Sequence, residues 1–347
     1  MKLRVGLVGV GAIAVESHLP VFRNLKNVEL AAICDQRIQA AEKAASQFGV
    51  NSIFGDLANM LSKEKLDVLD ICTPPQTHAS LSIQAMEAGC HVLVEKPMAT
   101  SVYEADKMIE YSKKHNVKLC VVHQNLCNPV VMKAKYLVES GAMGDLLNVD
   151  VRTFERKESE MCTNRNHWCH RLEPGGIFQE ILSHPIYLIQ SFLKNMRLVH
   201  ILSRKRGDFE WMKNDELRVL VESDNGLGSI AASCNSLIHG DALEILGSKM
   251  ALRADLWGRT LITFHPRSDQ SAFSVGRSNL DLSLQLFKVV GSTVSSAIKV
   301  FRGEVSAHYA FISRFIDSVL EDSEPPTTGQ DGRDTVKALE EICKELK

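Results

Sequence analysis

The 347-residue sequence predicts an α/β fold, with an N-terminal doubly wound parallel sheet and a second domain that combines helices with a mostly antiparallel sheet. Two observations lead to this expectation. In the first third of the chain, short apolar runs alternate with helical patterns, which is typical of a parallel sheet with helices on both faces. After residue 146, strand-like runs follow one another with turns such as Asp224-Asn225-Gly226 between them.

The stretch from Leu3 to Asp35 has the order strand, glycine turn, helix, strand, acid. Gly9 permits a sharp turn after the first apolar run, and Gly11 lets the backbone approach a pyrophosphate closely. Ala14 stands where a third glycine usually lies and still allows close packing of helix on strand. The first N–H groups of the helix would point at the phosphates. Together these parts predict a dinucleotide site, although an ordinary strand-to-helix turn can show the same glycine spacing.

Asp35 ends the second apolar run, where its carboxylate can accept hydrogen bonds from a ribose diol. A carboxylate at this point favours NAD, because it repels the 2′-phosphate of NADP. Arg37 follows two residues later and keeps NADP open as the alternative cofactor.

The alternation continues to residue 122. The patterns predict helices over 38–48, 57–61, 79–88 and 102–115, and strands over 51–54, 66–72, 90–94 and 117–122. Parallel sheets bind ligands beyond the carboxyl ends of their strands. Thr73-Pro74-Pro75 and Glu95-Lys96-Pro97 both follow buried strands and are expected at that edge. There the ammonium group of Lys96 can hold a substrate oxygen, or it can be an ordinary solvated lysine.

Composition limits the classes of partner. The net charge is −2 and there is no long basic run, so nucleic acid is not an expected partner. No apolar segment approaches the ~20 residues that a membrane span needs. The nine cysteines are scattered without a C-x-x-C pair, which is typical of reduced thiols in a cytoplasmic protein.

A polar stretch rich in arginine and histidine follows a predicted strand over 147–154. The cysteines and histidines between 162 and 170 match no metal signature, so no metal site is expected there. Arg165, His167, Trp168 and Arg171 can meet a carboxylate or phosphate and stack on a sugar face, or they can form a solvated loop.

Gly175 and Gly176 are expected to start a helix in which Glu180 and His184, four residues apart, share one face. A carboxylate one turn away orients an imidazole and supports its charged form, and such a histidine suits proton transfer near neutral pH. From the residues alone, a histidine with a structural partner is the simpler interpretation. Pro185 disfavours α geometry at His184, which predicts a kink.

The remaining chain alternates first and then turns helical. Strands are expected over 199–203, 217–223, 228–233, 242–247 and 250–255, and helices over 308–320 and 331–346. The segment 280–301 is amphipathic, with one apolar face made by Phe287, Val290, Val294, Ile298 and Phe301. We expect this face to pack on the protein itself or on a partner subunit. Binding to a membrane surface is the alternative, which the small number of basic residues disfavours.

Several of these motifs resemble the glucose–fructose oxidoreductase / inositol dehydrogenase / MocA family (Gfo/Idh/MocA). They are the Gly9/Gly11 turn, Thr73-Pro74-Pro75 followed by His78, Glu95-Lys96-Pro97, and the segments 128–129 and 135–144. The resemblance covers essentially the whole chain. It implies a Rossmann-type dinucleotide domain over 1–123 and a substrate and oligomerisation domain over 124–347 with a large open sheet. The final helix can pack back on the first domain.

The resemblance also implies a function. Members transfer hydride between NAD or NADP and a hydroxyl-bearing carbon of a sugar, sugar acid, polyol or nucleotide-linked sugar. By motif, His184 becomes the proton acceptor and Lys96 the lysine that faces the substrate. Glu180 takes the place of an orienting acid that is usually Asp, and its extra methylene moves the carboxylate by about a bond length. The residues expected at the cofactor are Gly9, Gly11, Ala12, Ile13, Asp35, Arg37, Thr73, Pro74, His78, Glu95 and Lys96.

Two other functions stay open at this point. One is an enzyme that keeps NAD bound and cleaves a glycosidic bond through transient oxidation. The other is a non-catalytic regulator that binds a dinucleotide. The expected partners are a small sugar-type molecule and further copies of the chain, as a homodimer or homotetramer formed through the C-terminal sheet.

Overall fold

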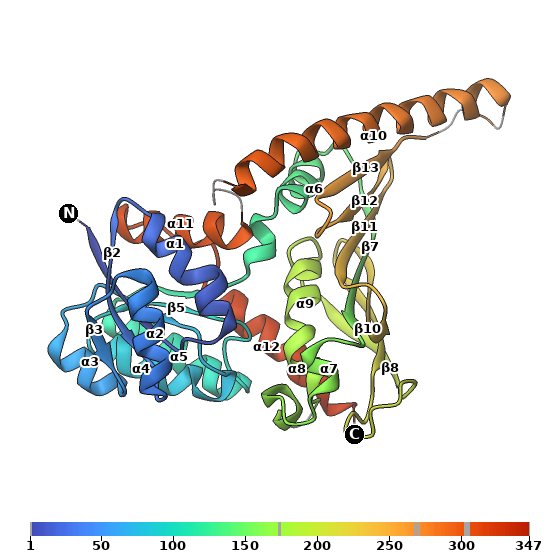
Figure 1. Cartoon of the computed structure of the whole chain (residues 1–347). Coiled ribbons are helices and arrows are strands. Elements are labelled where there is room, and N and C mark those ends of the chain that lie inside the picture. The colour runs from blue at the N-terminus through green and yellow to red at the C-terminus, as the bar shows by residue number, and fades with distance from the viewer. Residues whose placement is uncertain (1, 173–174, 267–268, 270, 302–305, 347) are drawn as a thin grey trace. The chain divides into compact units, whose positions relative to one another are not determined.

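The computed structural model describes residues 2–172, 175–266, 269, 271–301 and 306–346, with only the backbone described over 291–301 (Figure 1). Its internal contacts separate two compact units. The first unit comprises Met1–Gln124 and His308–Glu340, and the second comprises Asn125–Ala307 and Glu341–Lys347.

Within the described residues, the first unit contains a six-stranded parallel sheet in the order β3-β2-β1-β4-β5-β6. Its strands are β1 (Leu3–Val8), β2 (Val28–Cys34), β3 (Ser52–Phe54), β4 (Val68–Ile71), β5 (His91–Val94) and β6 (Leu119–Val121). The predicted doubly wound sheet is confirmed. Because β1 pairs with both β2 and β4, the strand order reverses at β1, and sheets of this kind bind ligands at such a point.

Helices connect these strands and end at local sequence signals. They are η1 (Ala14–His18), α1 (Leu19–Asn24), α2 (Ile38–Phe48), α3 (Leu57–Lys63), η2 (Pro75–Thr77), α4 (His78–Glu87), α5 (Val102–His115), α11 (Ala307–Leu320) and α12 (Gly329–Lys344). The side chains of Asp56 and Ser101 accept hydrogen bonds from the first turns of α3 and α5. Gly49 and Asn116 end α2 and α5 in the left-handed conformation.

The core of the first unit lies on both faces of its sheet. Leu7, Ile33, Leu69 and Leu93 are fully buried strand residues, as the continuous apolar runs predict for a parallel sheet. Val336, on α12 near the end of the chain, belongs to the same hydrophobic cluster as β4, β5 and β6.

In the described part of the second unit, seven strands form one sheet in the order β13-β12-β11-β7-β10-β9-β8. They are β7 (Leu146–Arg156), β8 (Arg197–Arg204), β9 (Glu216–Ser223), β10 (Gly226–Ser236), β11 (Gly240–Gly247), β12 (Ala251–Asp255) and β13 (Thr260–Phe264). The mostly antiparallel sheet is confirmed. Two features were not predicted: β7 pairs with β10 in parallel, and β13 adds a strand at the edge.

One face of this sheet is buried and the other is partly exposed. Val151 and Val219 are buried, whereas their neighbours Arg152 and Arg218 are exposed, which is the alternation expected of a strand with one covered face. The helical segments of the unit are η3 (Gln124–Cys127), α6 (Pro129–Glu139), α7 (Glu160–Thr163), η4 (Trp168–Arg171), α8 (Ile177–Ile181), α9 (Ser183–Gln190) and α10 (Ala272–Phe301). Among them, α9 packs on β7 and β10.

The amphipathic segment begins earlier than expected, because α10 starts at Ala272 and lies against β13 (Figure 1). The Gln285 amide bonds the backbone N–H and carbonyl of Thr263. Phe287 and Val290 are exposed, and the side chains of Val294, Ile298 and Phe301 lie outside the described part. None of the helices that the structure describes is both long enough and apolar enough to cross a membrane.

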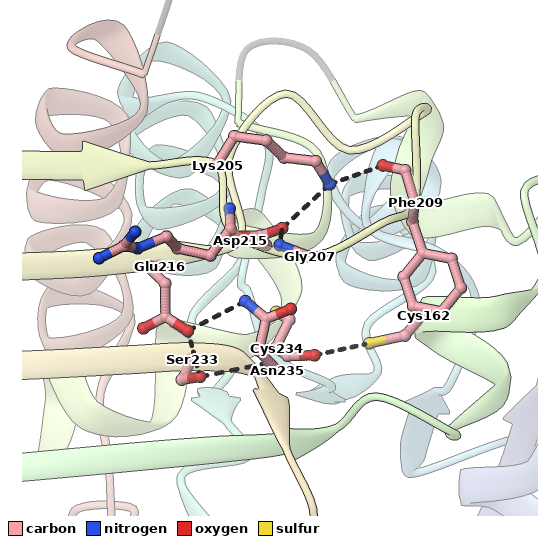
Figure 2. A network of polar contacts seen from close by, with 10 residues as sticks. Cys162, Lys205, Gly207, Phe209, Asp215, Glu216, Ser233, Cys234 and Asn235 are labelled. Carbon is pink, nitrogen blue, oxygen red and sulfur yellow. Dashed lines mark hydrogen bonds and ion pairs between the residues drawn. The ribbon is translucent and has the colours of Figure 1, made fainter.

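A buried carboxylate holds the connection between β8 and β9 (Figure 2). Asp215 accepts hydrogen bonds from the backbone N–H groups of Arg206 and Gly207, at 2.7 and 2.8 Å, and from Lys205 Nζ at 2.9 Å. Burial raises the pKa of Asp215, but the Lys205 ammonium and the two N–H groups outweigh burial and hold the pKa below its usual range. The loop is therefore fixed by an ionised group.

We expect Asp215→Asn to lower the free energy of unfolding by about 2 kcal/mol at neutral pH, because an amide cannot accept from both N–H groups and Lys205 together. The pKa of the folded state is depressed, so this stabilisation is present above the unfolded-state pKa of ~3.9 and is lost as the pH falls through the folded-state pKa. Urea unfolding at pH 7 and in acid measures the difference. Asp208→Asn, at an exposed position of the same loop, is the matched control. Equal stabilities of Asp215→Asn and wild type would contradict this account.

Candidate active site

The glycine turn after β1 needs glycine at its first position. Gly9 has φ +91°, and a Cβ placed on it would lie 2.8 Å from the Cys72 carbonyl carbon and 2.8 Å from Thr73 Cγ2. Only a residue without a side chain lets β1 approach the loop after β4 this closely. By contrast, no described heavy atom lies within 4 Å of a Cβ placed on Gly11, so the space before this backbone is open.

The first helical turn after Gly11 offers donors to that open space. Val15 N–H bonds the Gly11 carbonyl at 3.2 Å, so the N–H groups of Ala12 and Ile13 come before the first intrahelical bond. Such N–H groups bind phosphate oxygens readily. The residues present therefore fit a dinucleotide pyrophosphate at this turn.

Asp35 joins the end of β2 to the glycine turn. Its Oδ2 accepts the Val10 N–H at 2.9 Å, and its Oδ1 accepts the Arg37 N–H at 2.8 Å. The Asp35 side chain is largely buried, whereas the Arg37 side chain is exposed, with Nε 3.5 Å from Asp35 Oδ1. Asp35, which is expected to bind the ribose, is thus held rigidly next to the turn that contains Gly9 and Gly11.

The loops after β4 and β5 are tied together by His78. This residue is fully buried, and its ring nitrogens lie 2.7 Å from the Thr73 carbonyl oxygen and 2.9 Å from the Pro97 carbonyl oxygen. The Lys96–Pro97 peptide bond is cis. Thr73 and Pro74 retain exposed surface, so they can contact a ligand, whereas the buried His78 connects the two loops by its hydrogen bonds.

Glu95 and Lys96 follow β5 at the carboxyl edge of the sheet. Glu95 is buried, and its Oε2 accepts the Lys96 backbone N–H at 3.1 Å. Burial raises the pKa of Glu95, but the hydrogen bond from His18 and the charges of nearby basic groups outweigh it and lower the pKa to about 2. Lys96 is half-buried next to this permanent anion.

His18 and Asp70, the partners beneath Glu95, were not singled out from the sequence. Both are fully buried, and His18 lies between Asp70 and Glu95. The available signal was Asp70 inside the predicted buried strand 66–72, since Asp is almost never fully buried without a partner.

In the second unit, Glu180 and His184 lie on consecutive helices. Glu180 belongs to α8 and His184 to α9, and the two helices are separated by Leu182. His184 itself is helical, so the interruption comes two residues before the position at which Pro185 predicts a kink. Pro185 has no N–H to bond the Ile181 carbonyl, which accounts for a break at this point.

Tyr187, which was not singled out from the sequence, contacts the imidazole of His184. Tyr187 Oη lies 2.8 Å from His184 Nδ1, and it accepts the Asn125 N–H at 3.2 Å. The signal was present, because a tyrosine three residues after the histidine shares its helical face. This contact fixes the orientation of the ring.

Gly175, the first glycine of the pair before α8, is required by close packing. A Cβ placed on Gly175, which has φ +107°, would lie 2.4 Å from Cys343 Sγ. A cavity of about 240 Å³ next to the pair is lined by residues that include His170, Trp211 and Lys213.

The stretch expected to form a substrate loop contains the short helices α7 and η4. Arg165 and Arg171 are exposed, and the half-buried rings of His167 and Trp168 lie 5.5 Å apart. In the described part of the chain, the groups of side chains close enough to share a metal ion lie around His18 and not in this stretch.

Two family models match the chain. Residues 3–123 match the oxidoreductase family with an NAD-binding Rossmann fold, and residues 131–253 match the GFO/IDH/MocA C-terminal domain. The chain belongs to the Gfo/Idh/MocA oxidoreductase family. The resemblance noted from the motifs is thereby confirmed for the N-terminal domain and for much of the second domain.

Individual relatives agree with this assignment. D-glucoside 3-dehydrogenase of Escherichia coli (strain K12) is 30% identical over 154 residues, which is 44% of this chain and 44% of that protein. A glycosyl hydrolase family 109 protein of Shewanella sp. (strain W3-18-1) is 30% identical over 193 residues, which is 51% of this chain and 41% of that protein. The chain spans about half the length of the curated relatives it matches.

A solved structure shows the same fold over the whole chain. The WlbA dehydrogenase from Bordetella pertussis, in complex with NADH and UDP-GlcNAcA, has a TM-score of 0.80 and 22% sequence identity. The likeness covers 99% of this chain and 96% of that chain.

Gly9→Ala and Gly11→Ala form a matched pair of substitutions. We expect Gly9→Ala to lower the free energy of unfolding by about 2 kcal/mol or more, because both the positive φ and the close carbonyl oppose a methyl group. Gly11→Ala should leave urea unfolding nearly unchanged but weaken NAD⁺ binding in calorimetry, because the methyl group fills the open space. If Gly11→Ala binds NAD⁺ as tightly as wild type, the pyrophosphate does not lie at this turn.

Proposed function

We propose that this chain is an NAD-dependent dehydrogenase that interconverts a CH–OH group of a sugar or nucleotide-linked sugar and the corresponding ketone. The observation that carries the proposal is that the open Gly11 turn, Asp35 and Lys96 all lie at the carboxyl edge of one sheet. The relatives named D-glucoside 3-dehydrogenase and WlbA dehydrogenase, the latter bound to NADH and UDP-GlcNAcA, support a substrate of this class.

In this proposal Lys96 and His184 act on the same hydroxyl group. His184 takes the hydroxyl proton, with its ring oriented by Tyr187 and supported by Glu180. Lys96 binds the oxygen and stabilises the negative charge that develops as the proton leaves. When NAD⁺ is bound, its nicotinamide supplies the hydride acceptor. The chain's own residues provide placement and polarity.

We also propose roles for two surfaces of the second unit. The exposed Arg165 and Arg171 suit a carboxylate or phosphate of the substrate, with His167 and Trp168 beside them for the sugar face. The partly exposed face of the seven-stranded sheet, which carries Leu220, is the proposed interface of a homo-oligomer.

A panel of compounds tests the function directly. Full-length protein is mixed with NAD⁺ and myo-inositol, methyl D-glucosides, UDP-GlcNAc or UDP-GlcNAcA, and the absorbance of NADH is followed. His184→Ala should lower kcat by ~10²–10⁴-fold with little change in NAD⁺ affinity, as expected for loss of a general base. His265→Ala, at an exposed position just after β13, is the matched control. A wild-type kcat in His184→Ala would remove this residue from the mechanism.

Asp35→Asn tests the choice of cofactor. We expect NAD⁺ binding to weaken ~10-fold or more, because hydrogen bonds from a ribose to a charged acceptor are lost, and NADP⁺ binding to strengthen because the repulsion of its 2′-phosphate is removed. Calorimetry with both cofactors measures the ratio, and urea unfolding checks that the Val10 contact has survived. An unchanged ratio of the two affinities would show that Asp35 does not select the cofactor.

The second candidate function is NAD-assisted glycoside cleavage. The relative named glycosyl hydrolase family 109 protein favours it, and the same site residues would serve a transient oxidation. Release of p-nitrophenol from p-nitrophenyl glycosides, dependent on NAD⁺ but without net formation of NADH, would identify this activity.

A further inference from the structure

A buried group of ionisable side chains lies beneath Lys96 in the first unit. His18, on η1, is fully buried. Its Nδ1 lies 2.8 Å from Asp70 Oδ2, and its Nε2 lies 2.9 Å from Glu95 Oε1. Asp70 is on β4 and Glu95 follows β5, so one ring connects three elements of the sheet edge.

The charge state of Glu95 and the lengths of these contacts indicate where the protons of this group lie. Glu95 Oε2 accepts the Lys96 N–H and Oε1 lies 2.9 Å from His18 Nε2; because the pKa of Glu95 is lowered to about 2, this carboxylate accepts from both. Asp70 Oδ2 lies 3.5 Å from Cys72 Sγ, which donates to it, as well as 2.8 Å from His18 Nδ1. With Nε2 donating to Glu95 and Nδ1 2.8 Å from Asp70 Oδ2, these contacts are the ones that an imidazolium ion makes, in which both ring nitrogens carry a proton.

The surrounding charges support the same state. Burial lowers the pKa of His18, but Asp70 and Cys72 outweigh burial and raise the pKa well above its usual value. The ring of His308 lies 5.6 Å away, and burial together with the His18 charge lowers its pKa to about 4, so it stays neutral. Among the described residues, the ionisable groups that act on this site are Asp70, Cys72, Glu95, Lys96, His308 and the buried His123, whose pKa burial lowers to about 4.

A proton, and not a metal ion, is the better occupant of this cluster. Among the described residues, the sets His18-Asp70-Cys72 and His18-Glu95-His308 each have donor atoms within 4.8 Å of one another. Each set would need a ring nitrogen of His18 as a ligand. A protonated nitrogen has no lone pair to give, and the two short hydrogen bonds already use both nitrogens.

We propose that His18 is a positioning residue for Lys96. It stands as a fixed positive charge between Asp70 and Glu95, and it holds the Glu95 carboxylate against the Lys96 backbone N–H. Lys96 is thereby kept at the sheet edge in one orientation. This inference rests on the proposed function, in which Lys96 binds the substrate oxygen. Without the ring, two buried carboxylates would face each other uncompensated, one would take up a proton, and Glu95 would be free to turn.

Two substitutions distinguish the hydrogen bond of His18 to Asp70 from its hydrogen bond to Glu95. The amide nitrogen of Asn lies roughly where Nδ1 of a histidine does, and that of Gln lies roughly where Nε2 does. His18→Gln therefore keeps a donor to Glu95, and His18→Asn keeps the donor to Asp70. With a panel compound that wild type turns over, His18→Asn should lower kcat ~10–100-fold, because a small displacement of Lys96 is costly in rate. His18→Gln should lose clearly less, and NAD⁺ affinity should change little in either.

Two further readouts do not depend on activity. Hydrogen exchange at the Lys96 amide, which Glu95 protects, should be faster in His18→Asn than in His18→Gln or wild type. In ¹⁵N-histidine-labelled wild type, the His18 signal, which is assigned by its absence from His18→Gln, should keep both ring nitrogens protonated at pH values well above the usual histidine pKa. Asp70→Asn keeps the contact between His18 and Glu95 but removes the negative charge of Asp70. It should therefore lower the pKa of His18 toward its usual value, while hydrogen exchange at the Lys96 amide stays as slow as in wild type.

The outcomes are distinct. Three results would each overturn the proposal: equal exchange and equal kcat in His18→Asn and His18→Gln, a His18 signal that titrates normally in wild type, or one equivalent of bound metal in the purified protein. If wild type turns over no panel compound, while the NMR and exchange results are as expected, the proposed function fails and the positioning of Lys96 by His18 stands. Should both His18 variants fail to fold, wild type and Asp70→Asn still decide the question by NMR and exchange.

Discussion

The close approach of β1 to the loop after β4 is the constraint on which the candidate cofactor site depends. At Gly9 the backbone packs against the Cys72 carbonyl without room for a side chain. This contact places Gly9 beside Thr73, and the Asp35 carboxylate connects the turn to the end of β2 by accepting the Val10 N–H. Phosphate donors, a ribose acceptor and the loop after β4 thus come from three neighbouring strands whose positions are fixed by backbone contacts.

The parts of the fold that could be predicted are those with local signals. Apolar runs buried on both faces and the glycine turn are visible within a few residues of sequence. The parallel pairing of β7 with β10 is not, because it joins strands about 80 residues apart and alternation alone fixes a face, not a partner. The strand β13 is short and half-buried at an edge, where the pattern is weak.

The same distinction applies to the candidate site. Gly9, Gly11, Asp35 and Lys96 were identified because each belongs to a local motif with its own chemistry. His18 and Asp70 are 52 residues apart, and neither carries a motif, so only the folded sheet brings their side chains together. His78 was expected at the cofactor, and the structure places its ring between the carbonyl groups of Thr73 and Pro97, in the loops that follow β4 and β5. The sequence thus indicated the residues of local motifs better than it indicated the buried residues, such as His18 and Asp70, that hold those motifs in place.

A buried cluster of two carboxylates and an imidazolium is hard to explain by stability alone. Each ion loses hydration on folding, and apolar side chains of similar volume often stabilise a core at least as well. The cluster lies where the sheet edge presents Lys96, and one of its carboxylates bonds the Lys96 backbone. An ionised group that is already desolvated and fixed by hydrogen bonds does not need to reorganise when charge develops nearby. The position of the cluster, beneath the residue expected to bind the substrate oxygen, therefore explains its presence better than any contribution to stability does.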